Sequence, residues 1–140
     1  MDACSWTHFE HEADIGLAAT SDSREGLFEA MGAALTGVVT DPAIVQPRQR
    51  IRIQCGADDD GLLMVDWINS LIYEMATRRV LFGAWQVSLR DRELDAWVDG
   101  EPVDRERHEP AVEVKGATYT ELLVEQDATG RWRAQCVVDV

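Results

Sequence analysis

The chain has few of the residues that would mark a secreted, zinc-binding or membrane protein. Its three cysteines, Cys4, Cys55 and Cys136, are odd in number and have no CxxC spacing, which argues against a disulfide framework and against a zinc site. No stretch approaches the roughly 18 apolar residues of a membrane span. Residues 1–10 also lack the basic segment and apolar run of a signal peptide. We therefore expect a cytoplasmic protein with no membrane association.

Basic residues are also scarce. Thirteen Lys and Arg stand against 26 Asp and Glu, which gives a formal net charge of -13. Such a field repels polyanions and disfavours the counterion release that drives binding to RNA or DNA. We therefore expect no direct nucleic-acid binding. A basic protein or a divalent cation fits this surface better, because acidic clusters concentrate positive partners.

The motifs of familiar enzymes are absent as well. The sequence has no GxSxG, no HExxH, no P-loop and no GxGxxG, so no nucleophile with a partner base is visible. The length of 140 residues and the apolar content of 46% match one ordinary domain, residues 1–140, with a core that needs no disulfide or metal.

Two stretches have the apolar periodicity of amphipathic helices. The first follows Asp22 and Glu25, which resemble a capping box, and it should end near Thr40 because Asp41 precedes a proline. The second runs from Leu62 to about Arg79.

An acidic run, Asp58, Asp59 and Asp60, precedes the second helix. Acidic residues at this position complement the positive end of the helix dipole, which explains the run without a calcium site. A contribution of these three residues to a docking surface stays open.

Alternating patterns predict strands along the rest of the chain. We expect two extended pieces within 6–21 around a turn at 11–14, strands at 51–55, 111–115 and 121–125, a hairpin of 85–89 with 94–98 ended by a turn at 99–100, a polar loop at 101–110, and a last strand from 131 to 140. Hairpin order with two helices predicts an α+β fold, in which the helices pack on an antiparallel or mixed sheet.

Three aspartates stand at the ends of predicted elements: Asp14, Asp41 and Asp139. The last strand runs to the final residue, so we expect its end to be tied down. Hard divalent cations prefer oxygen ligands, and carboxylates from distant segments form a site only if the fold gathers them. His11 could act as a ligand or as a donor to a ligand. In the simpler alternative, an interaction module, the aspartates only cap elements and bind no ion.

Five separated blocks of this sequence resemble the archease family in order and spacing. They are His11-Glu12-Ala13-Asp14-Ile15-Gly16, Thr40-Asp41, Leu62-Leu63 to Trp67-Ile68, Lys115-Gly116-Ala117-Thr118-Tyr119 and Val138-Asp139-Val140. The resemblance covers essentially the whole chain.

This resemblance implies an accessory protein and not a stand-alone enzyme. Archeases assist the GTP-dependent RNA ligase of tRNA splicing and RNA repair, by promoting its guanylylation and multiple turnover. By position, Asp14, Asp41 and Asp139 match the family's acidic site for a divalent metal (calcium, magnesium or manganese), and Lys115 matches a basic residue that could contact a phosphate or the partner. Thr120 replaces a frequent histidine, which weakens any role for that position.

A second hypothesis uses the same carboxylates differently. A metal held by Asp14, Asp41 and Asp139 could make the protein a stand-alone metal-dependent phosphoesterase, because divalent ions stabilise charge in phosphoryl chemistry. Turnover of a phosphoester by the purified protein, abolished by a chelator, distinguishes the phosphoesterase hypothesis from the activator hypothesis.

Overall fold

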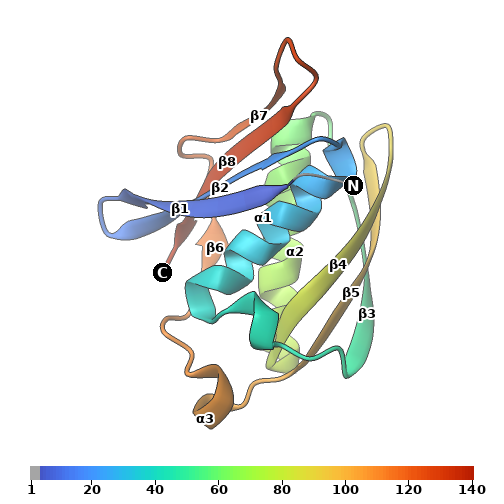
Figure 1. Ribbon diagram of the computed structural model, residues 1–140. Coiled ribbons are helices and arrows are strands. Elements are labelled where there is room, and N and C mark those ends of the chain that lie inside the picture. Colours follow the sequence, from blue (N-terminus) through green and yellow to red (C-terminus); the bar gives the residue numbers. More distant parts are fainter. Residues whose placement is uncertain (1–3) are drawn as a thin grey trace.

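The computed structural model describes residues 4–140 as an α+β fold whose two long helices lie between two antiparallel sheets (Figure 1). The elements, in chain order, are β1 (Ser5–His11), β2 (Asp14–Ser21), α1 (Arg24–Val39), the 3-10 turn η1 (Pro42–Ile44), β3 (Gln49–Gly56), α2 (Asp60–Arg78), β4 (Val80–Arg90), β5 (Glu93–Pro102), α3 (Arg105–His108), β6 (Gly116–Ala117), β7 (Leu123–Gln126) and β8 (Trp132–Asp139). The predicted fold class is thus confirmed, with the strands divided between two sheets.

The larger sheet joins the two ends of the chain. Its strand order is β1-β2-β8-β6, and β7 also pairs with β8. Ile15 pairs with Val138 and Leu17 with Cys136, so the first hairpin continues directly into the last strand. The predicted anchoring of the last strand is therefore confirmed.

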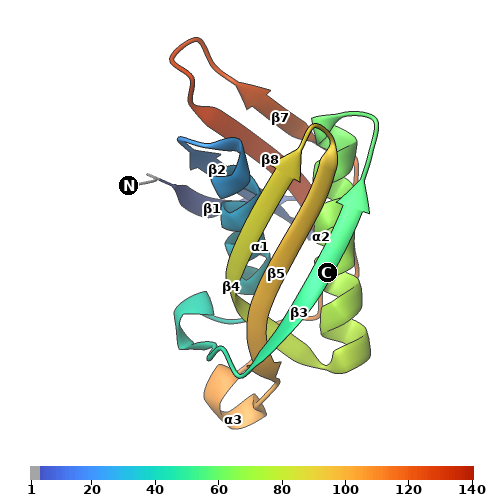
Figure 2. The ribbon, with the colours of Figure 1, turned by 90° about the vertical axis from the view of Figure 1, so that its right-hand side faces the viewer.

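The smaller sheet has the order β3-β5-β4 and curves around α2 (Figure 2). Helix α1 contacts β2 of the larger sheet and β4 of the smaller sheet, so its apolar face is buried on two sides. At the centre, the buried Trp67 of α2 donates its Nε1–H to the carbonyl of Phe28 in α1 at 2.8 Å. This bond satisfies the indole inside the core and fixes the two helices against each other.

The start of α1 differs by one residue from the prediction. Ser23, and not Asp22, is the N-cap, and its hydroxyl accepts the N–H of Gly26 at 3.0 Å. Asp22 instead forms an ion pair with Arg131. The helix ends at Val39 with Thr40 as its C-cap, as the proline at position 42 predicts.

Three local predictions between residues 99 and 117 are wrong. Asp99 and Gly100 lie inside β5 and make no turn. The expected loop contains the short helix α3. Residues 111–115 form no strand, and the pairing with β8 begins only at Gly116. None of the helices among residues 4–140 is long and apolar enough to cross a membrane.

Candidate functional site

A row of residues crosses the larger sheet at the end of β8. His11 pairs with Asp14 across the first hairpin, and Gly116 pairs with Asp139 on the other side of β8. The β2–β8 register, continued by one step beyond Ile15 and Val138, sets Asp14 opposite Asp139. The fold thus brings together two predicted site residues that are far apart in sequence.

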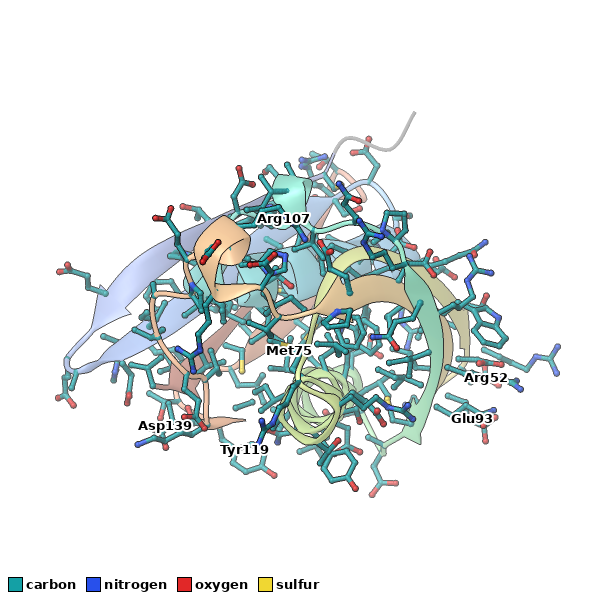
Figure 3. All side chains as sticks on the ribbon, turned by 90° about the horizontal axis from the view of Figure 1, so that it is seen from below. Arg52, Met75, Glu93, Arg107, Tyr119 and Asp139 are labelled. Atoms are coloured by element: carbon teal, nitrogen blue, oxygen red, sulfur yellow. The ribbon has the colours of Figure 1, made fainter. Side chains whose placement is uncertain are left out.

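The two carboxylates share the outer face of the sheet. The inward-facing residues Leu17 and Cys136 are fully buried against the helices, and Asp14 and Asp139 lie an odd number of residues away from them. Directly opposed residues of antiparallel strands have Cβ atoms roughly 4.5–5.5 Å apart. Asp14 is half-buried and Asp139 is exposed, and Figure 3 shows Asp139 pointing outward.

No cation of the described residues neutralises this pair. Neither Asp14 nor Asp139 forms an ion pair with any Lys or Arg among residues 4–140. Like charges directly opposite each other on a sheet are destabilising. A bound cation would relieve that repulsion.

The backbone of Lys115 is bonded to the backbone of Asp139, which places Lys115 next to this pair. Its N–H donates to the carbonyl of Asp139 at 2.8 Å, and its side chain is exposed. The following residues are also fixed, because Ala117 N–H donates to Asn69 Oδ1 at 2.8 Å and Thr118 Oγ1 donates to the carbonyl of Val137 at 2.9 Å. Asn69 and Thr118 were not among the predicted site residues. Only their hydrogen bonds show that they hold this segment in place.

Asp41 has a different local task. Its Oδ1 accepts the N–H of Ala43 at 3.0 Å, so it caps the 3-10 turn η1. Across residues 4–140, no three His, Cys, Asp or Glu side chains are grouped so that they could hold a metal ion. The predicted gathering of three carboxylates in one pocket is therefore not found, and the binding of a metal ion stays a prediction.

The acidic run before α2 follows the helix-capping interpretation. Asp59 is the N-cap, and its Oδ1 accepts the N–H of Leu62 at 2.8 Å. Asp60 forms an ion pair with Arg24 at 2.5 Å, which ties the start of α2 to the start of α1.

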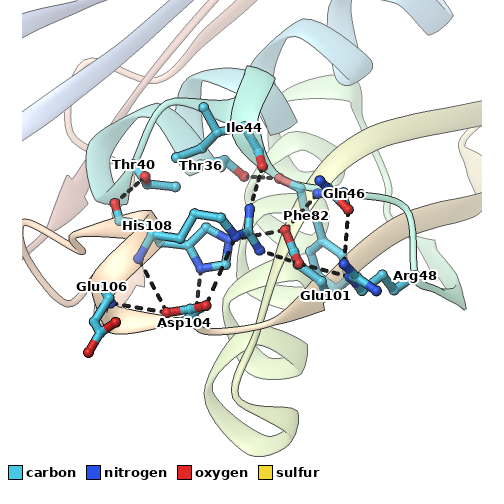
Figure 4. A network of polar contacts seen from close by, with 11 residues as sticks. Thr36, Thr40, Ile44, Gln46, Arg48, Phe82, Glu101, Asp104, Glu106 and His108 are labelled. Carbon is cyan, nitrogen blue, oxygen red and sulfur yellow. Dashed lines mark hydrogen bonds and ion pairs between the residues drawn. The ribbon is translucent and has the colours of Figure 1, made fainter.

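A buried polar network below α1 was not predicted from the sequence (Figure 4). Glu101 of β5 is 2% exposed and accepts hydrogen bonds at both oxygens. Oε1 accepts from Arg107 and from Arg48 Nε at 3.3 Å. Oε2 accepts from the backbone N–H of Gln46 at 2.7 Å and contacts His108 Nε2 at 3.1 Å. These donors, Arg107 first, hold the pKa of Glu101 down at about 2 against the opposing effect of burial.

The same contacts fix the tautomer of His108. Its Nδ1 lies 2.8 Å from the backbone nitrogen of Asp104, which can only donate, so Nδ1 accepts and the proton is on Nε2. The carbonyl of His108 accepts from Thr40 Oγ1 at 2.5 Å. The network therefore holds α3 and η1 against the end of α1, next to Asp41.

The fold and the site together define a class of protein. It is a small acidic α+β protein whose two long helices lie between two antiparallel sheets, with paired carboxylates at the end of the larger sheet. A family model described as the archease protein family matches residues 6–140. The chain therefore belongs to the archease family.

Known relatives and structures agree over nearly the full length. The chain is 33% identical over 139 residues to protein archease of Pyrococcus furiosus, covering 96% of this chain and 98% of the relative. It is 34% identical over 134 residues to protein archease of Sulfolobus acidocaldarius, covering 94% and 96%. The solution structure of protein 1598 from Methanobacterium thermoautotrophicum matches with a TM-score of 0.84 at 26% identity, covering 97% and 99%. A Thermotoga maritima structure, described as an archease and possible chaperone, shares the fold with a TM-score of 0.61 at 18% identity, covering 94% of each chain.

Proposed function

We propose that this protein is an accessory activator of a GTP-dependent RNA ligase in tRNA splicing or RNA repair. Family membership and the five sequence blocks support this role over that of a stand-alone enzyme. The net charge of -13 supports it as well, because an acidic helper is attracted to the basic groove with which a ligase binds RNA. The proposal rests on the register of β2 with β8, whose continuation beyond Ile15 and Val138 sets Asp14 opposite Asp139.

The donor set of this pair fits a hard divalent cation. Magnesium is commonly bound by one or two carboxylates and completes its shell with water and phosphate oxygens. Asp14 and Asp139 would hold such an ion, calcium and manganese being the other candidates, while His11 lies beside Asp14 in the same row. When bound, the ion would neutralise phosphate charge.

The residues of this chain then have separate tasks. The two carboxylates hold and orient the cation at an exposed edge, where the active site of a partner can reach it. The exposed Lys115 contacts a phosphate or an acidic group of the partner. Asp41 keeps η1 in place through Oδ1, so we assign the ion to the other two carboxylates.

Charge-neutral variants test this assignment. Asp139→Asn keeps the shape of the side chain and removes its charge, and Asp41→Asn is the matched control because asparagine still caps η1. We expect Asp139→Asn to weaken the binding of magnesium or manganese at least tenfold in calorimetry, and Asp41→Asn to leave it within twofold.

Ligase guanylylation is then measured with each protein. Wild type and Asp41→Asn should stimulate the reaction, and Asp139→Asn should not. Full stimulation by Asp139→Asn, or none by wild type, contradicts the proposal. Chelator-sensitive hydrolysis of a phosphoester by the protein alone would favour the phosphoesterase.

A further inference from the structure

An open groove lies between the end of α2 and the segment that leaves β5, and neither of the paired carboxylates lines it. Its volume is about 570 Å³. Its floor is apolar and includes Ile72, Met75 and Val80, and Figure 3 shows Met75 between α2 and α3. Val103 and Val112 on its rim are 37% and 39% exposed. The rim therefore leaves apolar surface in contact with water.

One wall of the groove is a strand sequence without a strand partner. Residues 111–115 alternate in the manner of a β-strand, yet they pair with no strand among residues 4–140. The segment is anchored at both ends, because Ala111 N–H donates to the carbonyl of Val39 at 2.9 Å and Lys115 N–H to that of Asp139 at 2.8 Å. Between these anchors, the N–H groups of 112–114 have no hydrogen-bond partner in the described part of the chain. Successive N–H groups of an extended chain point to opposite edges, so those of Val112 and Val114 form the unpaired edge on which an extended peptide can add.

The charge at the groove is opposite to that of the whole protein. Arg79 and Arg105 line it, against the single acidic side chain of Glu113. Eight arginines of the described chain form ion pairs with acidic neighbours, whereas Arg79 and Arg105, like Arg90 and Arg92 elsewhere, form none. Two guanidinium forks are thus available for carboxylates of a ligand.

Arg79 is the C-cap of α2 and has a φ of 54° and a ψ of 51°, the left-handed conformation. Glycine adopts that conformation at lower energy and is the common residue at helix ends. Glu12, Asp91, Glu109 and Glu121 also have a positive φ, so the backbone of Arg79 does not by itself assign a role to its side chain.

We propose that this groove binds an extended, acidic and apolar segment of a partner protein by strand addition along 111–115. The backbone of the segment pairs with the free N–H groups of Val112 and Val114, which lie on the same edge. One of its apolar side chains covers Met75, and its carboxylates reach Arg79 and Arg105. This inference is independent of the proposed ligase function, because it uses none of the predicted metal ligands.

Two peptides of opposite charge test the proposal by NMR titration of the full chain. The acidic probe is acetyl-Glu-Val-Asp-Val-Glu-amide, and the basic probe is acetyl-Lys-Val-Lys-Val-Lys-amide. We expect the acidic probe to shift the amide signals of Val103 and of 112–114, and to slow hydrogen exchange at Val112 and Val114. The basic probe should leave these signals unchanged, although it suits the overall charge of -13 better.

Neighbouring arginines provide a matched control. Arg79→Ala should weaken binding of the acidic probe at least tenfold. Arg78→Ala removes the same charge one residue away, at a side chain that pairs with Glu74 at 2.5 Å and does not line the groove, and should change binding less than twofold. Arg79→Gly should raise the melting temperature by relieving the backbone, yet weaken binding as much as Arg79→Ala.

Three results would overturn the proposal. The first is no binding of the acidic probe at millimolar concentration. The second is equal binding of both probes, or equal loss of binding in Arg78→Ala and Arg79→Ala. The third is saturation of the same signals by butyrate with the affinity of the peptide, which would make the groove a site for small carboxylates.

Discussion

Replacing Glu101 by glutamine should destabilise the fold although the change is nearly isosteric. Every group around the carboxylate is a donor: Arg48, Arg107, His108 and the backbone N–H of Gln46. In glutamine, an NH2 group with two donors replaces one carboxylate oxygen. Whichever way the amide is turned, the donors that bonded to that oxygen lose their acceptor.

The expected loss is about 2–3 kcal/mol of the free energy of unfolding. The His108 side chain is fully buried, and a buried donor left without an acceptor costs about 1–3 kcal/mol. Arg48 and Arg107 are 65% and 37% exposed, so their ion pairs add less than about 1 kcal/mol. For a domain of this size, the melting temperature should fall by about 6–9 °C.

The pH dependence gives a sharper measurement. Since the pKa of Glu101 is held at about 2 in the fold, below its usual 4.5, its stabilisation is complete above pH 4.5 and is lost as the pH falls toward 2. Calorimetry should therefore show that Glu101→Gln has a lower free energy of unfolding than wild type at pH 6, and that this gap shrinks by about half at pH 3. Glu93→Gln, an exposed residue of the same strand, is the control and should show no gap. The reasoning is refuted if the two proteins are equally stable at pH 6, or if the gap stays constant down to pH 3.

Two further predictions concern packing and cysteine chemistry. A Cβ at Gly16 would overlap the ring of Phe9, so Gly16→Ala should displace that ring and lower the free energy of unfolding by about 1 kcal/mol in urea titrations. The Cβ of Gly116→Ala would make only an ordinary contact, so this control should change the free energy of unfolding little. Equal effects of the two substitutions would contradict the reasoning. Burial raises the pKa of Cys55 and Cys136 to about 11, so iodoacetamide at pH 8 should label the exposed Cys4 first by mass spectrometry; labelling of Cys136 at a similar rate would contradict it.

The helices and most strands could be predicted because the spacing of their apolar residues follows directly from which face is buried. In α2, Trp67, Ile68 and Leu71 lie on the buried stripe that the sequence predicts. The division into two sheets could not be predicted, because it depends on which strands pair. The contact of β2 with β8 joins residues more than a hundred positions apart, and nothing local specifies it.

The failures between residues 99 and 117 share a physical cause. Helix α3 has four residues, too few to show a helical period. Residues 111–115 have the right pattern for a strand, but strand formation also needs a neighbour, and the end of β8 is taken by Gly116 and Ala117.

The site residues stay a prediction. Sequence position singled out Asp14, Asp41 and Asp139, and the register of β2 with β8, continued by one step, sets Asp14 opposite Asp139. The capping bond of Asp41 was not predicted, because a capping aspartate and a ligand aspartate look alike in sequence. Glu101 was missed because its burial depends on donors from η1 and α3.

The position of β8 has a consequence for how the chain matures. This strand is the last element, yet it joins β2 to β6 and β7 and so forms the middle of the larger sheet. During synthesis, the first hairpin must wait for nearly the whole chain to leave the ribosome before its inner edge is covered. A product truncated before residue 132 would expose that edge to aggregation, and it would also lack one of the two facing carboxylates.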